Sequence, residues 1–194
     1  MMVVTNNRVA GTWHHGYHFK PSKCDRNDPD YIFENNIAHS ISGYGGIAEN
    51  NKWACAEVKD FLAYKCGEAA IMHGGPSFIN RGRRLVSIET RYGISVHASE
   101  GVAEVLDSKS VGEIEDNFDC PEGSPCDHCI EKIGMVLPLG ADGGHDDRQE
   151  KSFKLPLFGG GSLTGYGYVK RHTFLNYDTP MTKCGRLNRA IKPK

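Results

Sequence analysis

The sequence predicts an α/β fold, because helical and strand-like hydrophobic patterns both occur along its 194 residues. The strongest helical pattern begins at Asn50 and Asn51, which are good N-caps, and ends at Gly67, a residue that commonly stops helices. The β-branched residues of the segment 85–98 favour strands instead. Hydrophobic residues make up 39% of the chain and charged residues 24%, which is typical of a globular protein.

The first part of the chain is predicted to combine short strands with one helix. The first fifty residues have weak periodicity and favour strands and loops, and residues 37–49 alternate well enough for a strand and a turn. The helix follows, and its apolar positions at helical spacing are Ala54, Val58, Phe61 and Leu62. No internal repeat is visible, and we interpret residues 1–194 as one domain.

The second part is predicted to alternate between the two types of element. Residues 85–98 favour a hairpin or a bent strand, and residues 100–108 a short helix. Residues 125–134 open with proline and close with glycine, as short helices do. A buried strand is expected at 135–139, and residues 153–177 are expected to form a strand, a glycine loop and a second strand.

The cysteines favour reduced thiols and metal ligation over disulfide bonds. Their number is odd, and a chain of this length does not need covalent cross-links to fold. The seven cysteines are Cys24, Cys55, Cys66, Cys120, Cys126, Cys129 and Cys184.

Cys126 and Cys129 form a Cys-x-x-Cys pair at the start of a predicted helix. The N–H groups and the dipole of a helix N-terminus stabilise thiolates, which are the form that binds zinc. Such a pair can belong to a structural zinc site, a redox dithiol or a catalytic metal site. Cys55 and Glu57, at the start of the predicted helix 50–67, would add a third thiolate and a carboxylate. Three protein ligands leave the fourth zinc position open for water, as in catalytic sites.

Cys55-Ala56-Glu57 followed by Pro125-Cys126-Asp127-His128-Cys129 resembles the signature of the zinc-dependent cytidine deaminase superfamily. The resemblance implies that Cys55, Cys126 and Cys129 bind Zn²⁺ and that Glu57 is the general acid/base in hydrolytic deamination of a nucleobase. It also implies a three-layer α/β/α fold with a mixed central sheet. The long interval between Glu57 and Cys126 implies an insertion there.

A nucleobase in the implied site would stack on aromatic side chains, for which Trp53 and Tyr44 are the candidates. The substrate would be a nucleoside, a nucleotide or a nucleic acid. The basic residues 183–194 favour a nucleic acid, whereas the all-cysteine ligation that the resemblance implies favours a free nucleoside, and both stay open. The overall pattern resembles divergent bacterial toxin or effector deaminases. That likeness implies a protein inhibitor or chaperone as a partner, and a location in the cytoplasm or in a target cell.

Two other interpretations of the cysteines stay open. In a binding module, Cys120, Cys126 and Cys129 would close a structural zinc site with one of Cys24, Cys55 or His128. In a redox protein, the Cys126–Cys129 pair would act as a dithiol, although no thioredoxin-like sequence surrounds it.

Two histidine patterns also attract attention. His97 and Glu100 imitate the His-x-Glu form of the first motif, but with one residue too many. His14, His15 and His18 would line a substrate pocket or hold a second metal, or simply belong to an exposed aromatic-rich loop. No apolar run is long enough to cross a membrane as a helix, and no secretory signal is visible.

Overall fold

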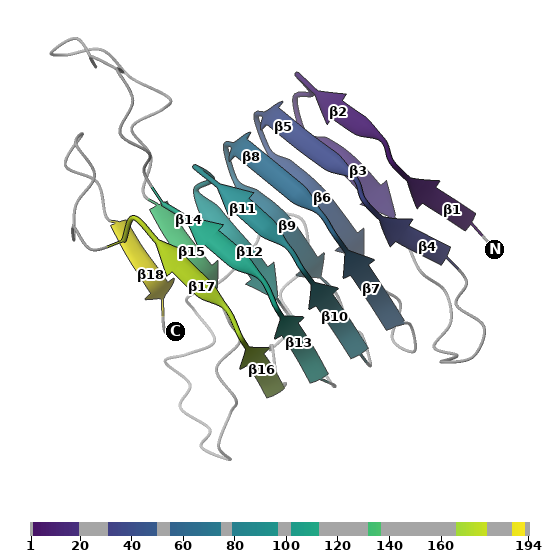
Figure 1. Cartoon of the computed structure of the whole chain (residues 1–194). Helices are drawn as coiled ribbons and strands as arrows, with labels where there is room; N and C mark the ends of the chain where they lie inside the picture. The colour runs from purple at the N-terminus through teal and green to yellow at the C-terminus, as the bar shows by residue number, and fades with distance from the viewer. Residues whose placement is uncertain are drawn as a thin grey trace, which may run out of the picture.

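Figure 1 shows the computed structural model, in which every regular element of the described residues is a β-strand. The structure describes residues 2–19, 31–49, 55–74, 79–96, 102–112, 132–136, 166–177 and 188–192. Eighteen strands within these ranges form three sheets of six strands each. Every pairing between neighbouring strands is parallel.

The strands are assigned to the sheets as follows. The first sheet contains β1 (Met2–Thr5), β4 (Tyr31–Glu34), β7 (Cys55–Lys59), β10 (Ile79–Arg83), β13 (Val102–Leu106) and β16 (Tyr166–Lys170). The second sheet contains β2 (Arg8–Ala10), β5 (Ile37–Ile41), β8 (Leu62–Cys66), β11 (Val86–Ile88), β14 (Lys109–Val111) and β17 (Thr173–Leu175). The third sheet contains β3 (His15–Phe19), β6 (Tyr44–Glu49), β9 (Ala69–Gly74), β12 (Tyr92–Val96), β15 (Lys132–Val136) and β18 (Asn188–Lys192).

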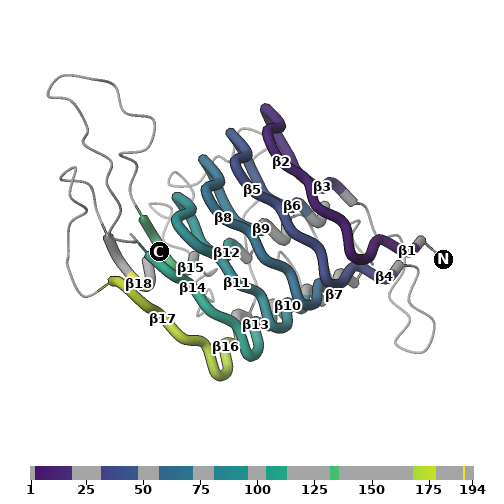
Figure 2. Tube along the Cα trace, turned by 45° about the horizontal axis from the view of Figure 1, so that its top comes forward, coloured from purple at the N-terminus to yellow at the C-terminus, as the bar shows by residue number. Residues whose placement is uncertain are grey.

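The chain visits the three sheets in turn, so three consecutive strands make one coil of a parallel β-helix. Strands β7, β10 and β13 begin at Cys55, Ile79 and Val102, which gives 23 or 24 residues for one coil. Six coils are stacked in line, from coil 1 with β1, β2 and β3 to coil 6 with β16, β17 and β18 (Figure 2). Equivalent residues of successive coils therefore form columns in which neighbours are about 4.8 Å apart.

The corners between sheets are made by single residues with left-handed backbone conformation. Between the first and second sheets this column contains Asn6, Asn35, Asp60, Arg84, Asp107 and Arg171, whose φ angles lie between 49° and 57°. After the second sheet the column contains Gly11, Ser40, Lys65, Glu89 and Asn176. Asn, Asp and Gly adopt this conformation more readily than other residues, which is why they recur at these corners. Each such residue redirects the chain from one sheet into the next.

The core is formed by inward-facing apolar side chains stacked in the same columns. The main cluster contains Phe33, Ala38, Ile41, Val58, Phe61, Ala63, Cys66, Ala70, Ile71, Leu85, Ile94, Val105 and Met135. Each is at most 3% exposed. Burial of a large aliphatic or aromatic side chain stabilises a fold by about 1.5–3 kcal/mol, so these columns supply the main driving force for stacking the coils.

The third sheet packs closely against the inward side chains of the second sheet, because each coil has a small residue at the same position of the third sheet. The column contains Gly16, Gly45, Ala70, Gly93, Gly134 and Ala190. A Cβ atom on Gly93 would lie 2.2 Å from the carbonyl oxygen of Gly134. The absence of a side chain there is therefore a packing requirement.

The predicted α/β/α fold is wrong, because the described residues form parallel sheets and contain no helix. The helix predicted at 50–67 is replaced, from Cys55 onward, by β7 and β8. Its misleading signal has a structural origin in the corners at Asp60 and Lys65, which each shift the alternation of a strand by one residue. The buried positions consequently fall at Val58, Phe61, Ala63 and Cys66, a spacing that imitates a helix.

Two other expected helices are also corrected. Residues 102–106 of the predicted helix 100–108 form β13, and residues 132–134 of the predicted helix 125–134 belong to β15. The segment 85–98 contains two strands as expected, but β11 and β12 lie in different sheets and do not form a hairpin. Residues 37–49 contain the expected strand, as β5, and the expected turn, at residues 42–43, and the second strand β6 follows within the same segment.

The expectation of no internal repeat is likewise wrong. Asn6-Asn7 and Asn35-Asn36 occupy equivalent corners of coils 1 and 2, and small residues recur in the third sheet. These are the positions that a repeat search should align. Among the described residues no helix is long and apolar enough to cross a membrane.

Candidate functional site

Of the three predicted zinc ligands, only Cys55 lies among the residues that the structure describes. Cys55 and Glu57 both belong to β7. Cys126, Cys129 and Trp53 lie outside the described residues. Because Cys55 lies on a strand, the helix N-terminus that was expected to favour its thiolate is absent from that position. Within the described ranges, no group of three His, Cys, Asp or Glu residues is arranged to hold a metal ion.

Glu57, the predicted general acid/base, is part of a charged surface on the first sheet. Its Oε2 lies 3.4 Å from Nζ of Lys59, and its Oε1 lies 3.3 Å from Nε of Arg83. The side chain is 37% exposed. Arg81 and Glu104 form a further ion pair on the same sheet, between neighbouring strands. Glu57 therefore lies between two cations on this surface.

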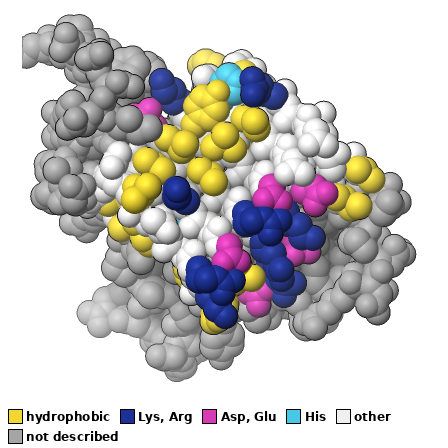
Figure 3. Space-filling model, viewed as in Figure 1, with side chains coloured by type: hydrophobic (Ala, Val, Ile, Leu, Met, Phe, Trp, Pro, Cys, Tyr) yellow, Lys and Arg dark blue, Asp and Glu magenta, His cyan; other side chains and the backbone are white. Residues whose placement is uncertain are grey.

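The corner beside this sheet continues the alternation of charge. Arg84 donates two hydrogen bonds to Asp60, at 2.5 and 2.6 Å, and Arg171 pairs with Asp107 in the same way two coils further on. The hydrogen bonds from arginine lower the pKa of both aspartates. Acids and bases thus neutralise one another across this face, and Figure 3 shows them as interleaved blue and magenta groups. Exposed pairs of this kind contribute about 0–1 kcal/mol each.

Tyr44, a predicted substrate-binding residue, lies on β6 and is 8% exposed. It belongs to a second apolar cluster with Ile47 and Ala69, against which Tyr92 packs. Burial, and secondarily the charge of Glu68, raise the pKa of its hydroxyl. Most of the Tyr44 ring surface is thus occupied by packing.

The three histidines predicted as a pocket or metal site lie together on coil 1. The ring centroids of His14 and His15 are 5.8 Å apart, and those of His15 and His18 are 5.7 Å apart. His15 also contacts the Tyr44 ring at 5.7 Å. Burial lowers the pKa of His15, and the neighbouring His18 lowers it further by charge repulsion.

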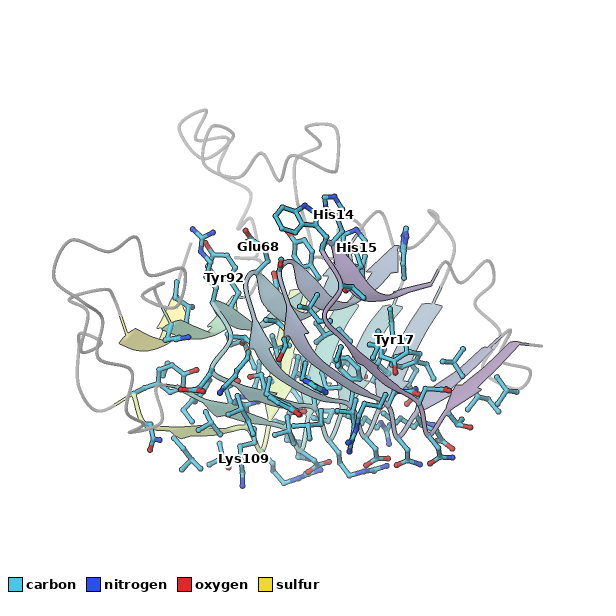
Figure 4. All side chains as sticks on the ribbon, turned by 90° about the horizontal axis from the view of Figure 1, so that it is seen from above. His14, His15, Tyr17, Glu68, Tyr92 and Lys109 are labelled. Atoms are coloured by element: carbon cyan, nitrogen blue, oxygen red, sulfur yellow. The ribbon has the colours of Figure 1, made fainter. Side chains whose placement is uncertain are left out.

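A polar pair lies on the same side of the molecule as these histidines. Arg91 is bonded to Glu68 at 3.3 Å, and its guanidinium carbon lies 5.0 Å from the centre of the Tyr92 ring. Figure 4 shows His14, His15, Glu68 and Tyr92 along one edge, whereas Lys109 projects from the opposite side. Imidazole, carboxylate, guanidinium and phenol groups therefore lie along this edge of the molecule.

The outer face of the second sheet is apolar, in contrast to that of the first. Its outward residues form two rows that run along the stack of coils. Each row contains one residue from each strand, and neighbours in a row are paired in the sheet. Seven side chains of these rows, here called the apolar face, are Ile37, Leu62, Val86, Tyr64, Ile88, Val111 and Leu175. They are half-buried or exposed, whereas the inward residues between them, such as Ala38 and Ser110, are fully buried. Figure 3 shows the apolar face as a continuous yellow area over this sheet.

The polar members of the two rows are Lys109 and His39, together with Arg8 and Thr173 on the end strands β2 and β17. Lys109 follows Val86 in one row and is exposed, and no described residue forms an ion pair with its ammonium group. His39 stacks on Tyr64 with a centroid distance of 4.7 Å and an interplanar angle of 3°. The strands from β5 to β17 thus present an apolar area with one positive charge, that of Lys109, and Arg8 adds a second at the β2 end of the same row.

Sequence reasoning missed the apolar face because it assigned Leu62 to the buried side of a helix. An alignment of the coils would have revealed it: Leu62 and Tyr64 occupy the same positions as Val86 and Ile88. On a strand, residues two apart lie on one face, so this recurrence indicates an apolar outer surface.

We compared the chain with family models, with curated proteins and with solved structures, and none of them matches it.

Proposed function

We propose that this chain is a protein-binding module whose apolar face holds an amphipathic helix of another protein. The observation that carries the proposal is the pair of outward apolar rows on the second sheet, where a solvent-facing sheet normally has polar residues. The side chains of the face are half-buried, except for the exposed Leu175, and continuous apolar areas that solvent reaches mark interaction sites.

The dimensions of the apolar face support a helix as the occupant. The five strands from β5 to β17 extend over about 19 Å along the stack, which about 13 helical residues would cover. Residues three or four apart on a helix are about 5–6 Å apart, close to the spacing of about 4.8 Å between neighbouring coils. A helix that lies along the stack would therefore contact each coil with one apolar side chain.

Lys109 supports an acidic partner. Lys109 follows Val86 in its row and precedes Val111 on β14, and no described residue forms an ion pair with its ammonium group. A carboxylate on the bound helix would supply a counterion, and charge complementarity of this kind selects partners more than it adds affinity. Two copies of the chain joined by a two-fold axis at this point would bring two Lys109 side chains together. Acidic amphipathic helices fit the face better than a second copy does.

The proposal is tested with two labelled peptides of about 18 residues, long enough to cover the face. Both carry leucine at the i, i+3 and i+4 positions, and one carries glutamate and the other lysine at the flanking positions. Fluorescence anisotropy is expected to show tighter binding of the acidic peptide. Ile88→Asp is expected to weaken that binding at least about tenfold, because it introduces a charge at the centre of the face. Lys109→Glu is expected to transfer the preference to the basic peptide.

Ser42→Asp is the matched control, because it adds the same charge at an exposed position away from the apolar face. It should leave the affinity for the acidic peptide unchanged, and circular dichroism should show that all variants remain folded. Equal binding of the two peptides by the native chain would overturn the proposal. So would a dimer of the native chain that Ile88→Asp dissociates, because the face would then belong to a second copy.

A further inference from the structure

The large hydrophobic residues exposed among the described residues are confined to the two end coils. They are Val3 at 53%, Trp13 at 77%, Tyr168 at 49% and Leu175 at 42%. Val3 and Trp13 belong to coil 1, and Tyr168 and Leu175 belong to coil 6. Stacked repeat proteins usually place polar residues on their outermost repeats, so this distribution departs from the expected pattern.

The exposed residues of the two end coils occupy matching columns. Val3 and Tyr168 are the first and last described members of one column of the first sheet. Ala10 and Leu175 stand at the two ends of a column of the second sheet.

The inward columns match in the same way. Val4 and Val169 begin and end one column, and Val9 and Phe174 begin and end another. All four of these residues are only partly buried against the core. If coil 6 were placed over coil 1 in the same register, apolar side chains would meet in all four columns.

The polar groups at one corner are complementary as well. Inside the stack, the backbone N–H of Asn7 in coil 1 donates to Oδ1 of Asn36 in coil 2 at 3.0 Å. Three coils further on in the same column, the backbone N–H of Leu85 donates to Oγ of Ser108 at 3.0 Å. In coil 1, no described residue donates to Oδ1 of Asn7. In coil 6, His172 occupies this column, and no described residue accepts from its backbone N–H.

The strands of the end coils also have unused pairing edges. Within the described residues, β1, β2 and β3 each pair with one neighbour, and so do β16, β17 and β18. Alternate N–H and C=O groups on such edges point away from the neighbouring strand and are available to another strand.

We propose that copies of this chain stack head to tail, with coil 6 of one copy on coil 1 of the next. This arrangement continues the parallel pairing of all three sheets and places the His172 N–H opposite Oδ1 of Asn7. It joins Tyr168 to Val3 and Leu175 to Ala10. The contact is heterologous and does not close on itself, so the number of copies in an assembly grows with concentration.

Two variants with one blocked end each test the proposal. The first, Val3→Lys with Ala10→Lys, places two charges on coil 1, and the second, Tyr168→Lys with Leu175→Lys, places two on coil 6. All four positions are exposed, so the folds should be retained, and circular dichroism and thermal unfolding check this. Sedimentation velocity should show assemblies of the native chain that grow with concentration, and a monomer for each variant alone.

The mixture of the two variants is the decisive sample. It should contain a dimer with one copy of each, because the free coil 6 of the first variant fits the free coil 1 of the second. A native chain that stays monomeric at all concentrations tested would overturn the proposal. A mixture without this dimer, or a dimer of either variant alone, would do so too, because a symmetric contact of like ends would produce that result. Thr12→Lys would be a poor choice for blocking coil 1. The hydroxyl of Thr12 donates a hydrogen bond to the carbonyl oxygen of His15 at 2.9 Å, so its loss would also change the local fold.

Discussion

The Nε2 atom of His172 lies 3.0 Å from the hydroxyl oxygen of Ser110 in the interior of the coils. Ser110 donates its own proton to the carbonyl oxygen of Gly134 at 2.7 Å and accepts a hydrogen bond from Ser87 at 3.1 Å. The hydroxyl oxygen of Ser110 therefore acts as an acceptor for His172, which fixes the neutral tautomer with its proton on Nε2. Nδ1 of His172 is buried without a hydrogen-bond partner among the described residues. A second proton on this ring would be held in a site that offers it no acceptor.

Acid is therefore expected to destabilise the protein through His172. Burial lowers the pKa of this imidazole from 6.5 to about 4. Between those two pH values the unfolded chain binds a proton that the folded chain excludes, so the free energy of unfolding falls as the pH falls from 6.5 to 4. Allowing for partial solvent screening, the loss is about 2 kcal/mol. Urea denaturation at a series of pH values measures it, and His172→Gln should reduce the slope within this window. An unchanged slope in the variant would show that another group is responsible.

A methyl group at Gly93 is expected to disrupt the stacking of coils 4 and 5. The added Cβ would lie 2.2 Å from the carbonyl oxygen of Gly134 and 2.7 Å from Oγ of Ser87. Backbone atoms cannot rotate away as side chains do, so Gly93→Ala should cost about 3 kcal/mol or more. Gly11→Ala is the control, because Gly11 has a φ of 68° but no atom within 4 Å of the new methyl. It should cost only about 1 kcal/mol. Similar losses for both variants would contradict the close approach at Gly93.

Removal of one corner ion pair is expected to have a small effect that depends on salt. Arg84→Ala leaves Asp60 without its bidentate partner, but both side chains are partly exposed to water. The free energy of unfolding should fall by less than about 1 kcal/mol at low ionic strength, and by less still in 1 M salt. Denaturation of the native chain and the variant at both salt concentrations gives the comparison. A loss of several kcal/mol would mean that the pair does more than neutralise the corner.

The zinc deaminase prediction can be tested separately from the fold. It requires bound zinc that is lost in Cys126→Ser, and ammonia release from cytidine or from DNA that is lost in Glu57→Gln while the zinc is retained. Glu104→Gln is a matched control, because it removes an equivalent carboxylate from the same sheet. Metal analysis and an ammonia assay provide the measurements. Equal ammonia release by the native chain and Glu57→Gln would discard the role predicted for this carboxylate.

Part of the fold could be predicted from the sequence alone. The strand content of residues 37–49 followed from their alternation, and β16 and β17 fall within the segment where a strand was expected. Parts of these segments alternate with a period of two, which indicates a strand with one buried face.

The helical interpretation of residues 55–66 failed for a specific physical reason. A left-handed corner residue adds one position to the chain without placing a side chain in the core. Because of Asp60 and Lys65, the spacing between buried residues is therefore a mixture of two and three instead of a constant two. A window that contains two strands and two corners then matches a helical template. Only alignment with the next coil, where Arg84 and Glu89 stand at the same corners, distinguishes the two cases.

The apolar face could not be predicted without that alignment either. Leu62 and Val86 are 24 residues apart and become neighbours only through the register of β8 and β11. The role of Glu57 as a general acid/base stays a prediction, and its ion-pair partners Lys59 and Arg83 were not anticipated. Arg83 is adjacent to it only because coils 3 and 4 pair in parallel.

The parallel stacking of the coils also determines how the molecule would resist mechanical force. The hydrogen bonds between neighbouring coils run along the axis of the stack, so tension along that axis acts on all coil interfaces in series. Every interface then carries the same force, and the weakest one separates first. Stretching in an optical trap would accordingly extend the chain in steps of 23 or 24 residues where coils are regular, as they are from β7 to β13.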